Sequence, residues 1–221
     1  MVLSSVKNIK LGDLYYSKTL SIKLKSLSNL GRNETVISDL KNLVSNFPNR
    51  DDYKLYLADI LRSSGFHRES IDYYDNLIKE ITDPKKDDWG IFYSRGISHE
   101  RLKNWKLSEK DLLKAIELKP DAAYVLNYLG YSWLERKINI HRAVKMLEIA
   151  YKHNENDPYI ADSVGWGYFL TGRYVEAEKF MKKAIILMPN DPIVNDHYGD
   201  ILWSLNKKLQ AKFYWQSVLN F

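Results

Sequence analysis

Apolar side chains recur along much of the chain at the spacing of an amphipathic helix, in segments bounded by glycine or proline. The clearest segment has small and apolar residues at intervals of three and four, at Ala177, Phe180, Met181 and Ala184. This spacing puts them on one face of an α-helix. We expect Gly172 to end the preceding helix with a positive φ, and Pro189 to end this one because it has no N–H to donate. The pattern predicts two helices joined by a tight turn.

The same arrangement returns about every 34 residues, in units that begin near residues 17, 51, 89, 123, 158 and 192. Small residues hold matching places: Gly96, Gly130, Gly165 and Gly199 come eighth in their units, Ala177 and Ala211 twentieth, and Ala184 twenty-seventh. A glycine inside a helix costs about 1 kcal/mol relative to alanine. Its repetition therefore indicates places where two helices approach closely. An ordinary helical bundle has no need of such a fixed period.

At these positions the sequence resembles the tetratricopeptide repeat family, over residues 17–221 and most closely in the last four units. The resemblance implies an all-α fold, a right-handed superhelical solenoid of about six helix-turn-helix units. Residues 1–16 would form an N-terminal segment that is the remnant of a preceding helix. The alternative architecture is a 35-residue helical repeat of the class that binds single-stranded RNA.

In the tetratricopeptide family, the first helix of each unit lines a concave face that receives partners. The resemblance implies that the partner-binding residues here are Tyr93, Asn127, Tyr131, Tyr159, Asp162, Trp166, Phe169, Asp196, Asp200 and Trp203. This set is aromatic and acidic, which suits a protein or peptide partner with basic and apolar residues. The alternative is that the rings pack between neighbouring units and that the aspartates form a solvated face.

The net charge of +5 is concentrated at the N-terminus, where residues 1–50 hold eight Lys or Arg against three Asp or Glu. The lysines in question include Lys7, Lys10, Lys18, Lys23 and Lys25. They predict an alternative function, an RNA-binding or anionic-surface-binding helical repeat that uses the basic N-terminal units. The expected groove is short of cations, which argues against nucleic acid on that face.

The sequence contains none of the common patterns for catalysis or metal binding. It has no cysteine, its five histidines show no HExxH or other paired spacing, and neither GxxxxGK[ST] nor GxGxxG occurs. We therefore expect no catalytic residue, no metal and no cofactor. The function predicted from the repeats is that of a non-catalytic scaffold or adaptor for protein binding.

Two further expectations concern location and self-association. No apolar run approaches the ~20 residues of a membrane span, which predicts a soluble, cytoplasmic chain without a transmembrane segment. The C-terminal units, for example NYLGYSWLER, are similar to those of proteobacterial tetratricopeptide adaptors, some of them envelope lipoproteins. That similarity implies an envelope location if a longer precursor has a targeting signal. The closing AKFYWQSVLNF has more apolar residues than one inward face needs, so we expect self-association through this helix or a longer array.

Overall fold

The computed structural model describes residues 30–219, and within this range the chain consists of helices and turns, without a β-strand. The prediction of an all-α fold is confirmed for this part. Its α-helices are α3 (Asn33–Asn46), α4 (Asp51–Ser63), α5 (His67–Glu80), α6 (Trp89–Arg101), α7 (Trp105–Leu118), α8 (Ala123–Glu135), α9 (Ile140–His153), α10 (Pro158–Leu170), α11 (Tyr174–Leu187), α12 (Pro192–Ser204) and α13 (Lys208–Val218). A 3₁₀ turn, η1 (Lys86–Asp88), precedes α6.

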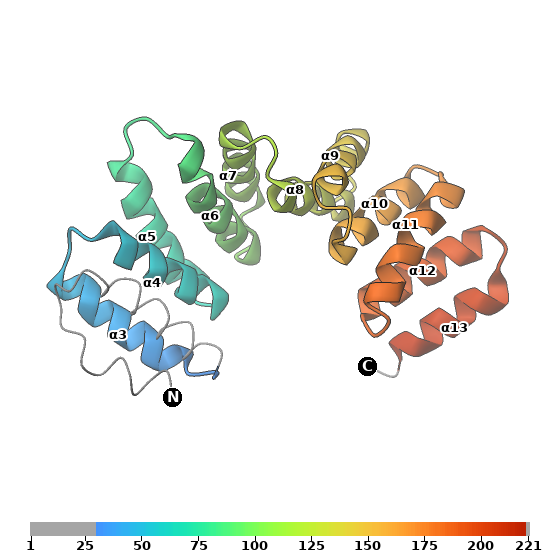
Figure 1. The fold of residues 1–221 in the computed structure, drawn as a ribbon, viewed down its shortest axis with the longest axis horizontal. Coiled ribbons are helices and arrows are strands. Elements are labelled where there is room, and N and C mark those ends of the chain that lie inside the picture. The colour runs from blue at the N-terminus through green and yellow to red at the C-terminus, as the bar shows by residue number, and fades with distance from the viewer. Residues whose placement is uncertain (1–29, 220–221) are drawn as a thin grey trace. The chain divides into compact units, whose positions relative to one another are not determined.

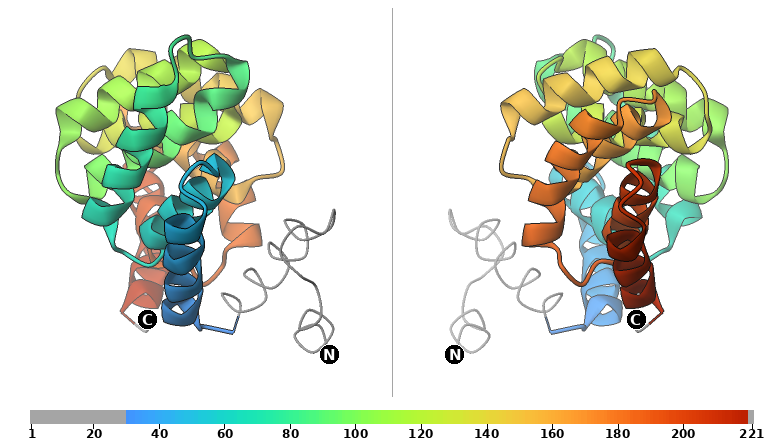
Figure 2. Two further views of the ribbon diagram at one scale, coloured as in Figure 1. Left: turned by 90° about the vertical axis from the view of Figure 1, so that its left-hand side faces the viewer. Right: turned by 90° about the vertical axis from the view of Figure 1, so that its right-hand side faces the viewer.

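Contacts within the chain divide it into two compact units, Met1–Asp111 (unit 1) and Leu112–Phe221 (unit 2), with the division inside α7. In unit 1 each helix from α3 to α6 packs against the next, and in unit 2 the helices from α8 to α13 do the same. Figure 1 shows these neighbours within each unit, and the views in Figure 2 agree with it. In unit 2, α10 also contacts both α8 and α12. These three helices therefore form a row.

Five helices begin at the residues from which the second to sixth sequence units were counted, namely Asp51, Trp89, Ala123, Pro158 and Pro192. Each of these five helices is 13 residues long. Each is followed by a short turn and a second helix that packs back on it. We call the first helix of a pair helix A and the second helix B. The first helix expected for the unit at residue 17 lies outside the described residues.

The turns between helices A and B share one left-handed residue, and the turn between α8 and α9 is one residue longer and has a second, Asn139. The fifteenth residue of each unit has a positive φ, at Gly31, Gly65, Lys103, Lys137, Gly172 and Asn206. In the turn after α10, the Arg173 N–H donates to the carbonyl of Tyr168 and the Gly172 N–H to that of Phe169. This pair of bonds is the Schellman motif, which satisfies the last carbonyls of helix A. Gly172 thus has the left-handed conformation expected of it, with φ +78°.

Two A helices of unit 2 have matched N-terminal caps. Asp157 precedes Pro158 and accepts hydrogen bonds from the next two free N–H groups, and Asp191 does the same before Pro192. Proline suits the first helical position because its missing N–H would have no partner there. The DP dipeptides therefore fix where α10 and α12 begin. Pro189 lies just beyond α11, which ends at Leu187.

The repeated small residues lie where helices A and B touch. A Cβ added to Gly165 would lie 3.2 Å from the Met181 Cε and 3.3 Å from the Ala177 carbonyl oxygen. A Cβ at Gly130 would lie 2.9 Å from the Leu147 Cγ, and one at Gly199 would collide with the Trp215 indole. The remaining small residues of the pattern, Gly96, Ala177, Ala184 and Ala211, are also buried. Each pair in unit 2 is therefore packed without space for a larger residue at these places.

Unit 1 combines an apolar core with buried polar contacts. Its apolar cluster includes Val36, Leu40, Leu57 and Leu61 from α3 and α4. Beyond this cluster, the Arg95 guanidinium donates two hydrogen bonds to Asp111, at 2.7 and 2.6 Å, and one to Asp75 at 2.7 Å. Ser70 and Ser98 share a buried hydrogen bond of 2.9 Å. Polar groups thus join α5, α6 and α7.

Candidate partner-binding surface

Nine of the ten predicted partner-binding residues lie on α8, α10 and α12 of unit 2, and the tenth, Tyr93, lies on α6 of unit 1. We call the exposed side of the row formed by α8, α10 and α12 the A-helix face. The Tyr93 ring packs beside Trp89 with 6.0 Å between the ring centroids. It is described with unit 1 and takes no part in the A-helix face of unit 2.

The middle of the A-helix face is an aromatic cluster built around His197. The Trp166 indole stacks on the His197 ring with centroids 4.0 Å apart and an interplanar angle of 11°, and Phe169 stacks on Trp166 at 4.8 Å. Tyr131 lies 6.4 Å from His197 between ring centroids. The His197 Nδ1 lies 3.0 Å from the Asp162 carboxylate. We call these five residues the central cluster, and it joins helices from three successive pairs.

The burial of the central cluster, and the polar atoms around it that lack a hydrogen-bond partner within residues 30–219, distinguish it from an open groove. Asp162 and His197 are both only 6% exposed, so Asp162 joins α10 to α12 and is not presented to solvent. Burial, and then the carboxylates of Glu135 and Asp162, raise the pKa of Tyr131 well above its usual range. Within residues 30–219, the Trp166 Nε1 and the Asn127 Oδ1 are buried and have no hydrogen-bond partner. Leaving such an atom unpaired costs about 1–3 kcal/mol.

An exposed stripe runs beside the central cluster, at the second residue of each A helix. Its members are Tyr124 on α8, Tyr159 on α10 and Ile193 on α12, which are 57%, 62% and 54% exposed. The Tyr124 hydroxyl accepts a hydrogen bond from Asn154 at 3.3 Å. We call these three residues the position-2 stripe. Large apolar side chains held in the open at one repeat position are typical of an interaction surface.

The three helices of the A-helix face contain no lysine or arginine. Their acidic residues are Glu135, Asp162, Asp196 and Asp200. Because Asp162 is bonded to His197, the carboxylates that remain open lie at the two ends of the row. The face is therefore aromatic with acidic ends.

The last helix pair holds the remaining predicted residues around a pocket of about 530 Å³. We call this the end pocket, and it is lined by Asp196, Asp200, Lys212, Trp215, Gln216, Val218 and Leu219. Burial and the neighbouring Asp196 raise the pKa of Asp200, while a hydrogen bond from Trp215 opposes this shift. Trp203 is 44% exposed, with its ring centroid 5.5 Å from that of Trp215. Lys208 lies over the Trp203 ring at 5.2 Å.

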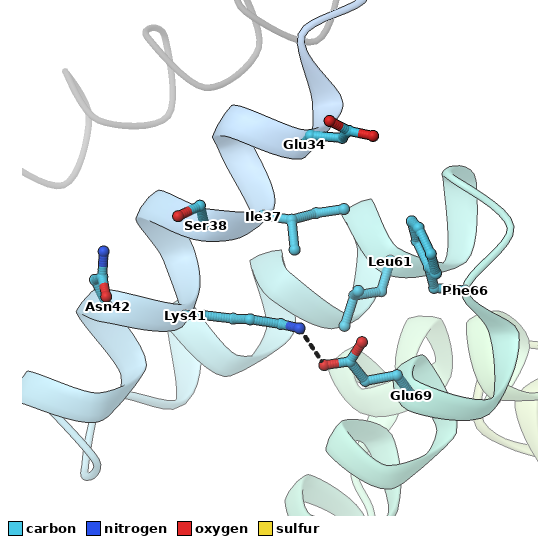
Figure 3. Close-up of a pocket in the computed structure, with 8 residues that line it drawn as sticks. All are labelled: Glu34, Ile37, Ser38, Lys41, Asn42, Leu61, Phe66 and Glu69. Atoms are coloured by element: carbon cyan, nitrogen blue, oxygen red, sulfur yellow. Dashed lines mark ion pairs between the residues drawn. The ribbon is translucent and has the colours of Figure 1, made fainter.

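Unit 1 has a pocket of its own, of about 420 Å³, on α3 beside the turn between α4 and α5. Figure 3 shows Ile37, Leu61 and Phe66 on its apolar side and the Lys41–Glu69 ion pair, 2.6 Å long, across it. Its lining cation, Lys41, is paired with Glu69, so the pocket lacks the unpaired cations that a phosphate ligand needs. The N-terminal lysines that predict RNA or anionic-surface binding, Lys7 to Lys25, lie outside the described residues.

Several residues that matter here lie outside the ten predicted partner-binding residues. His197 was outside the predicted binding set, yet it is the centre of the aromatic cluster. Tyr124 and Ile193 belong to the stripe, and Lys212 lines the end pocket. The available signal was positional, since Tyr124 and Ile193 share the second place of their units with Tyr159. His197 is sixth in its unit, a place that favours a groove or interhelix residue, but the sequence does not identify its partners because they come from other repeats.

Comparison with known proteins identifies relatives in sequence and in fold. No family model matches the chain. A TPR repeat-containing protein of Pseudomonas aeruginosa is 33% identical over 114 residues, which are 52% of this chain and 19% of that protein. The chain thus spans about a fifth of that relative's length. A solved tetratricopeptide repeat protein of Parabacteroides merdae superposes with a TM-score of 0.70 at 18% identity, covering 92% of this chain and 79% of the other. The helix pairs of this chain have the fold of tetratricopeptide repeats.

A second solved neighbour is MamA, residues 41 to the end, from Desulfovibrio magneticus. It has a TM-score of 0.65 at 17% identity and covers 77% of this chain and 93% of its own. Stacked repeats of this kind create extended surfaces that serve for binding, and this chain has that architecture. Among residues 30–219, no three His, Asp or Glu side chains gather where they could hold a metal ion. Nor is any helix of that range long and apolar enough to cross a membrane.

Proposed function

We propose that this chain is a non-catalytic scaffold or adaptor that binds a peptide segment or helix of a partner protein on the A-helix face of unit 2. The position-2 stripe is the observation on which the proposal rests. Tyr124, Tyr159 and Ile193 hold the same place on successive A helices and are more than half exposed. Tyrosine is enriched among the residues that dominate binding energy at protein interfaces. A partner that lies along the row would cover all three.

The charge of the face favours a protein partner over nucleic acid. Binding to phosphates requires cations that replace the counterions of the nucleic acid, and α8, α10 and α12 have no lysine or arginine. The open carboxylates of Asp196 and Asp200 would instead attract lysine or arginine in the partner. The preferred segment is therefore one with aromatic or aliphatic residues and at least one cation.

The central cluster would serve as the rigid floor of this site. Trp166, Phe169 and His197 stack in one column, and the Asp162–His197 bond fixes α10 against α12. A preorganised floor reduces the ordering that binding would otherwise require. Tyr131 and Asn127 flank this floor on α8. Asp162 contributes by holding the helices in place, so its substitution would damage the face itself.

The test uses peptides selected from a random library against the whole chain. Their affinities would be measured by calorimetry with the wild type and with a Tyr124→Ala, Tyr159→Ala, Ile193→Ala variant. We expect at least about tenfold weaker binding in the variant, because interface aromatics of this kind contribute more than 1 kcal/mol each. Circular dichroism would show that the variant keeps its helices.

A matched control comes from α11, where Val175, Ile186 and Leu187 are 58%, 76% and 58% exposed on the B-helix side. Their triple alanine variant removes similar apolar area and should leave peptide affinity unchanged. Equal losses in the two variants, or peptides that bind both as well as the wild type, would contradict the proposed site. A labelled single-stranded RNA that binds with a steep salt dependence would favour the alternative function of the N-terminal lysines.

A further inference from the structure

The last helix pair of unit 2 repeats the preceding pair in register, with an offset of 34 residues. In this register four residues of the end pocket, Asp196, Asp200, Trp215 and Leu219, correspond to Asp162, Trp166, Met181 and Ile185 of the preceding pair. In the preceding pair, α12 covers this surface, since it packs on both α10 and α11. The end pocket is thus the equivalent of a surface that a helix already occupies one repeat earlier.

The difference in burial shows that the equivalent surface on the last pair is open. Ile185 is 9% exposed beneath α12, whereas Leu219, at the equivalent place just after α13, is 85% exposed. Asp162 is buried against His197, whereas Asp196 is exposed. Within the described residues, no helix lies on the end pocket as α12 lies on the preceding pair.

Charge indicates what would fill the pocket. In the preceding pair the cluster formed by Asp162 and Trp166 receives His197 from the next A helix. In the last pair both of the equivalent positions are aspartates, Asp196 and Asp200, and no lysine or arginine among the described residues pairs with them. Burial and the neighbouring carboxylate already raise the pKa of Asp200. A cation placed at the position of His197 would relieve this repulsion.

A second charge is reversed between the two pairs. Glu178 on α11 accepts two hydrogen bonds from Lys207, which follows α12, both at 2.7 Å. The residue equivalent to Glu178 on α13 is Lys212, which lines the end pocket and has no ion pair within the described residues. A segment that binds the end pocket should therefore have a carboxylate at the position equivalent to Lys207.

We propose that the end pocket receives a helix of a partner protein, seated on α12 and α13 as α12 is seated on α10 and α11. The docking helix has an arginine or lysine in the place of His197, facing Asp196 and Asp200. The segment just after this helix has an aspartate or glutamate in the place of Lys207, facing Lys212. This site goes beyond the proposed function, because it uses the end of the stack and leaves the position-2 stripe free.

The probe for this test is a stapled, fluorescein-labelled peptide with the sequence of Pro192–Lys207 and the changes His197→Arg and Lys207→Glu. Fluorescence polarisation would measure its affinity for the whole chain. We expect binding that weakens at least about tenfold when the chain has Asp196→Asn and Asp200→Asn. These changes keep the side-chain shape and leave an acceptor for the Trp215 N–H, so the fold should persist, as circular dichroism would show.

A charge exchange provides the matched control. The chain variant Lys212→Glu should lose affinity for the probe and regain it when the probe keeps Lys207. A probe with His197→Glu should not bind the wild-type chain. Absence of binding by the original probe, or equal affinity for the Asp and Asn chains, would overturn the proposal.

Two other outcomes separate this site from its alternatives. If sedimentation shows that the chain itself dimerises and that Lys212→Glu abolishes the dimer, the occupant is a second copy and the partner-helix proposal is wrong. The chain with Tyr124→Ala and Tyr159→Ala should bind the probe as the wild type does. If it does, a negative result with the library peptides would not affect the end-pocket proposal. A negative result with the probe would contradict the end-pocket proposal alone, and the library peptides would still test the A-helix face.

Discussion

The two compact units have the same repeat geometry, but the contacts on which their helices depend differ. In unit 1 a buried guanidinium, Arg95, connects α5, α6 and α7 through Asp75 and Asp111. In unit 2, besides the Asp162–His197 and Glu178–Lys207 contacts, the two helices of a pair approach closely at a glycine, as at Gly165 beneath Met181. A pair that depends on a buried charge fails when the partner charge is removed, whereas one that depends on close packing fails when volume is added. The same fold should therefore break differently in its two units.

The largest effect is expected from Asp111→Ala in unit 1. The Arg95 and Asp111 side chains are 17% and 6% exposed, so the substitution leaves a largely buried cation without its main partner. Breaking a buried pair in this way costs about 3–5 kcal/mol. Urea unfolding would measure the loss, and hydrogen exchange should place it in α5 to α7. The control Asp75→Ala removes the more exposed partner, 55% exposed, and should cost at most about 1 kcal/mol. Equal losses from the two variants would contradict this account.

The next effect is expected from Gly165→Val in unit 2. The new side chain meets the Met181 side chain and the Ala177 carbonyl oxygen, and overpacking of this kind costs about 1–3 kcal/mol. Gly90→Val is the matched control, because nothing lies within 4 Å of a Cβ added at Gly90. That control should be neutral or stabilising, since glycine is the poorer helix former. A chain with Gly165→Val as stable as the wild type would show that the helices of this pair are not in close contact.

A smaller effect is expected at the Glu178–Lys207 pair. The two side chains are 12% and 40% exposed, and ion pairs this close to solvent contribute up to about 1 kcal/mol. Lys207→Met should therefore lower the free energy of unfolding by no more than that amount. The loss should shrink in 1 M salt, where charges are screened over about 3 Å. A salt-independent loss would indicate that the lysine stem, and not its charge, is responsible.

The smallest effect is expected from pH, and it should appear in unit 1. Burial lowers the pKa of His99, Arg95 lowers it further, and Asp111 and Asp75 oppose the shift. The unfolded chain therefore binds the proton more readily than the folded chain. The stability that neutral His99 contributes is complete above its ordinary pKa of 6.5 and is lost as the pH falls through the lower folded-state value. With His99→Leu, the urea midpoint should change less between about pH 7 and pH 5 than it does in the wild type. Burial also lowers the pKa of His67, so a residual slope should remain.

The repeat pattern predicted the elements of the fold because each rule concerns residues close in sequence. The DP dipeptides mark the starts of α10 and α12, and Gly172 occupies a turn that requires a positive φ. The fold class followed from these local rules and their period. The division into domains and the partner-binding role of the predicted residues stay predictions.

The sequence did not predict which side chains contact one another across neighbouring repeats. Asp162 and His197 are 35 positions apart, and whether an aspartate at that place faces solvent or a neighbour depends on how one pair is rotated against the next. Arg95 and Asp111 present the same problem. A repeat pattern reports the place of a residue within its unit, but it contains no information on the rotamer that the next unit imposes.

The turns between helices A and B offer a route to engineer this protein. Lys103 and Lys137 adopt φ values of 63° and 54° in a conformation that glycine holds in three other repeats, and a side chain there costs about 1 kcal/mol. Replacing these two lysines with glycine would raise the thermal tolerance of the chain. Neither lysine belongs to the A-helix face or to the end pocket. A more stable variant of this kind would therefore be a suitable scaffold for grafting new recognition residues onto either surface.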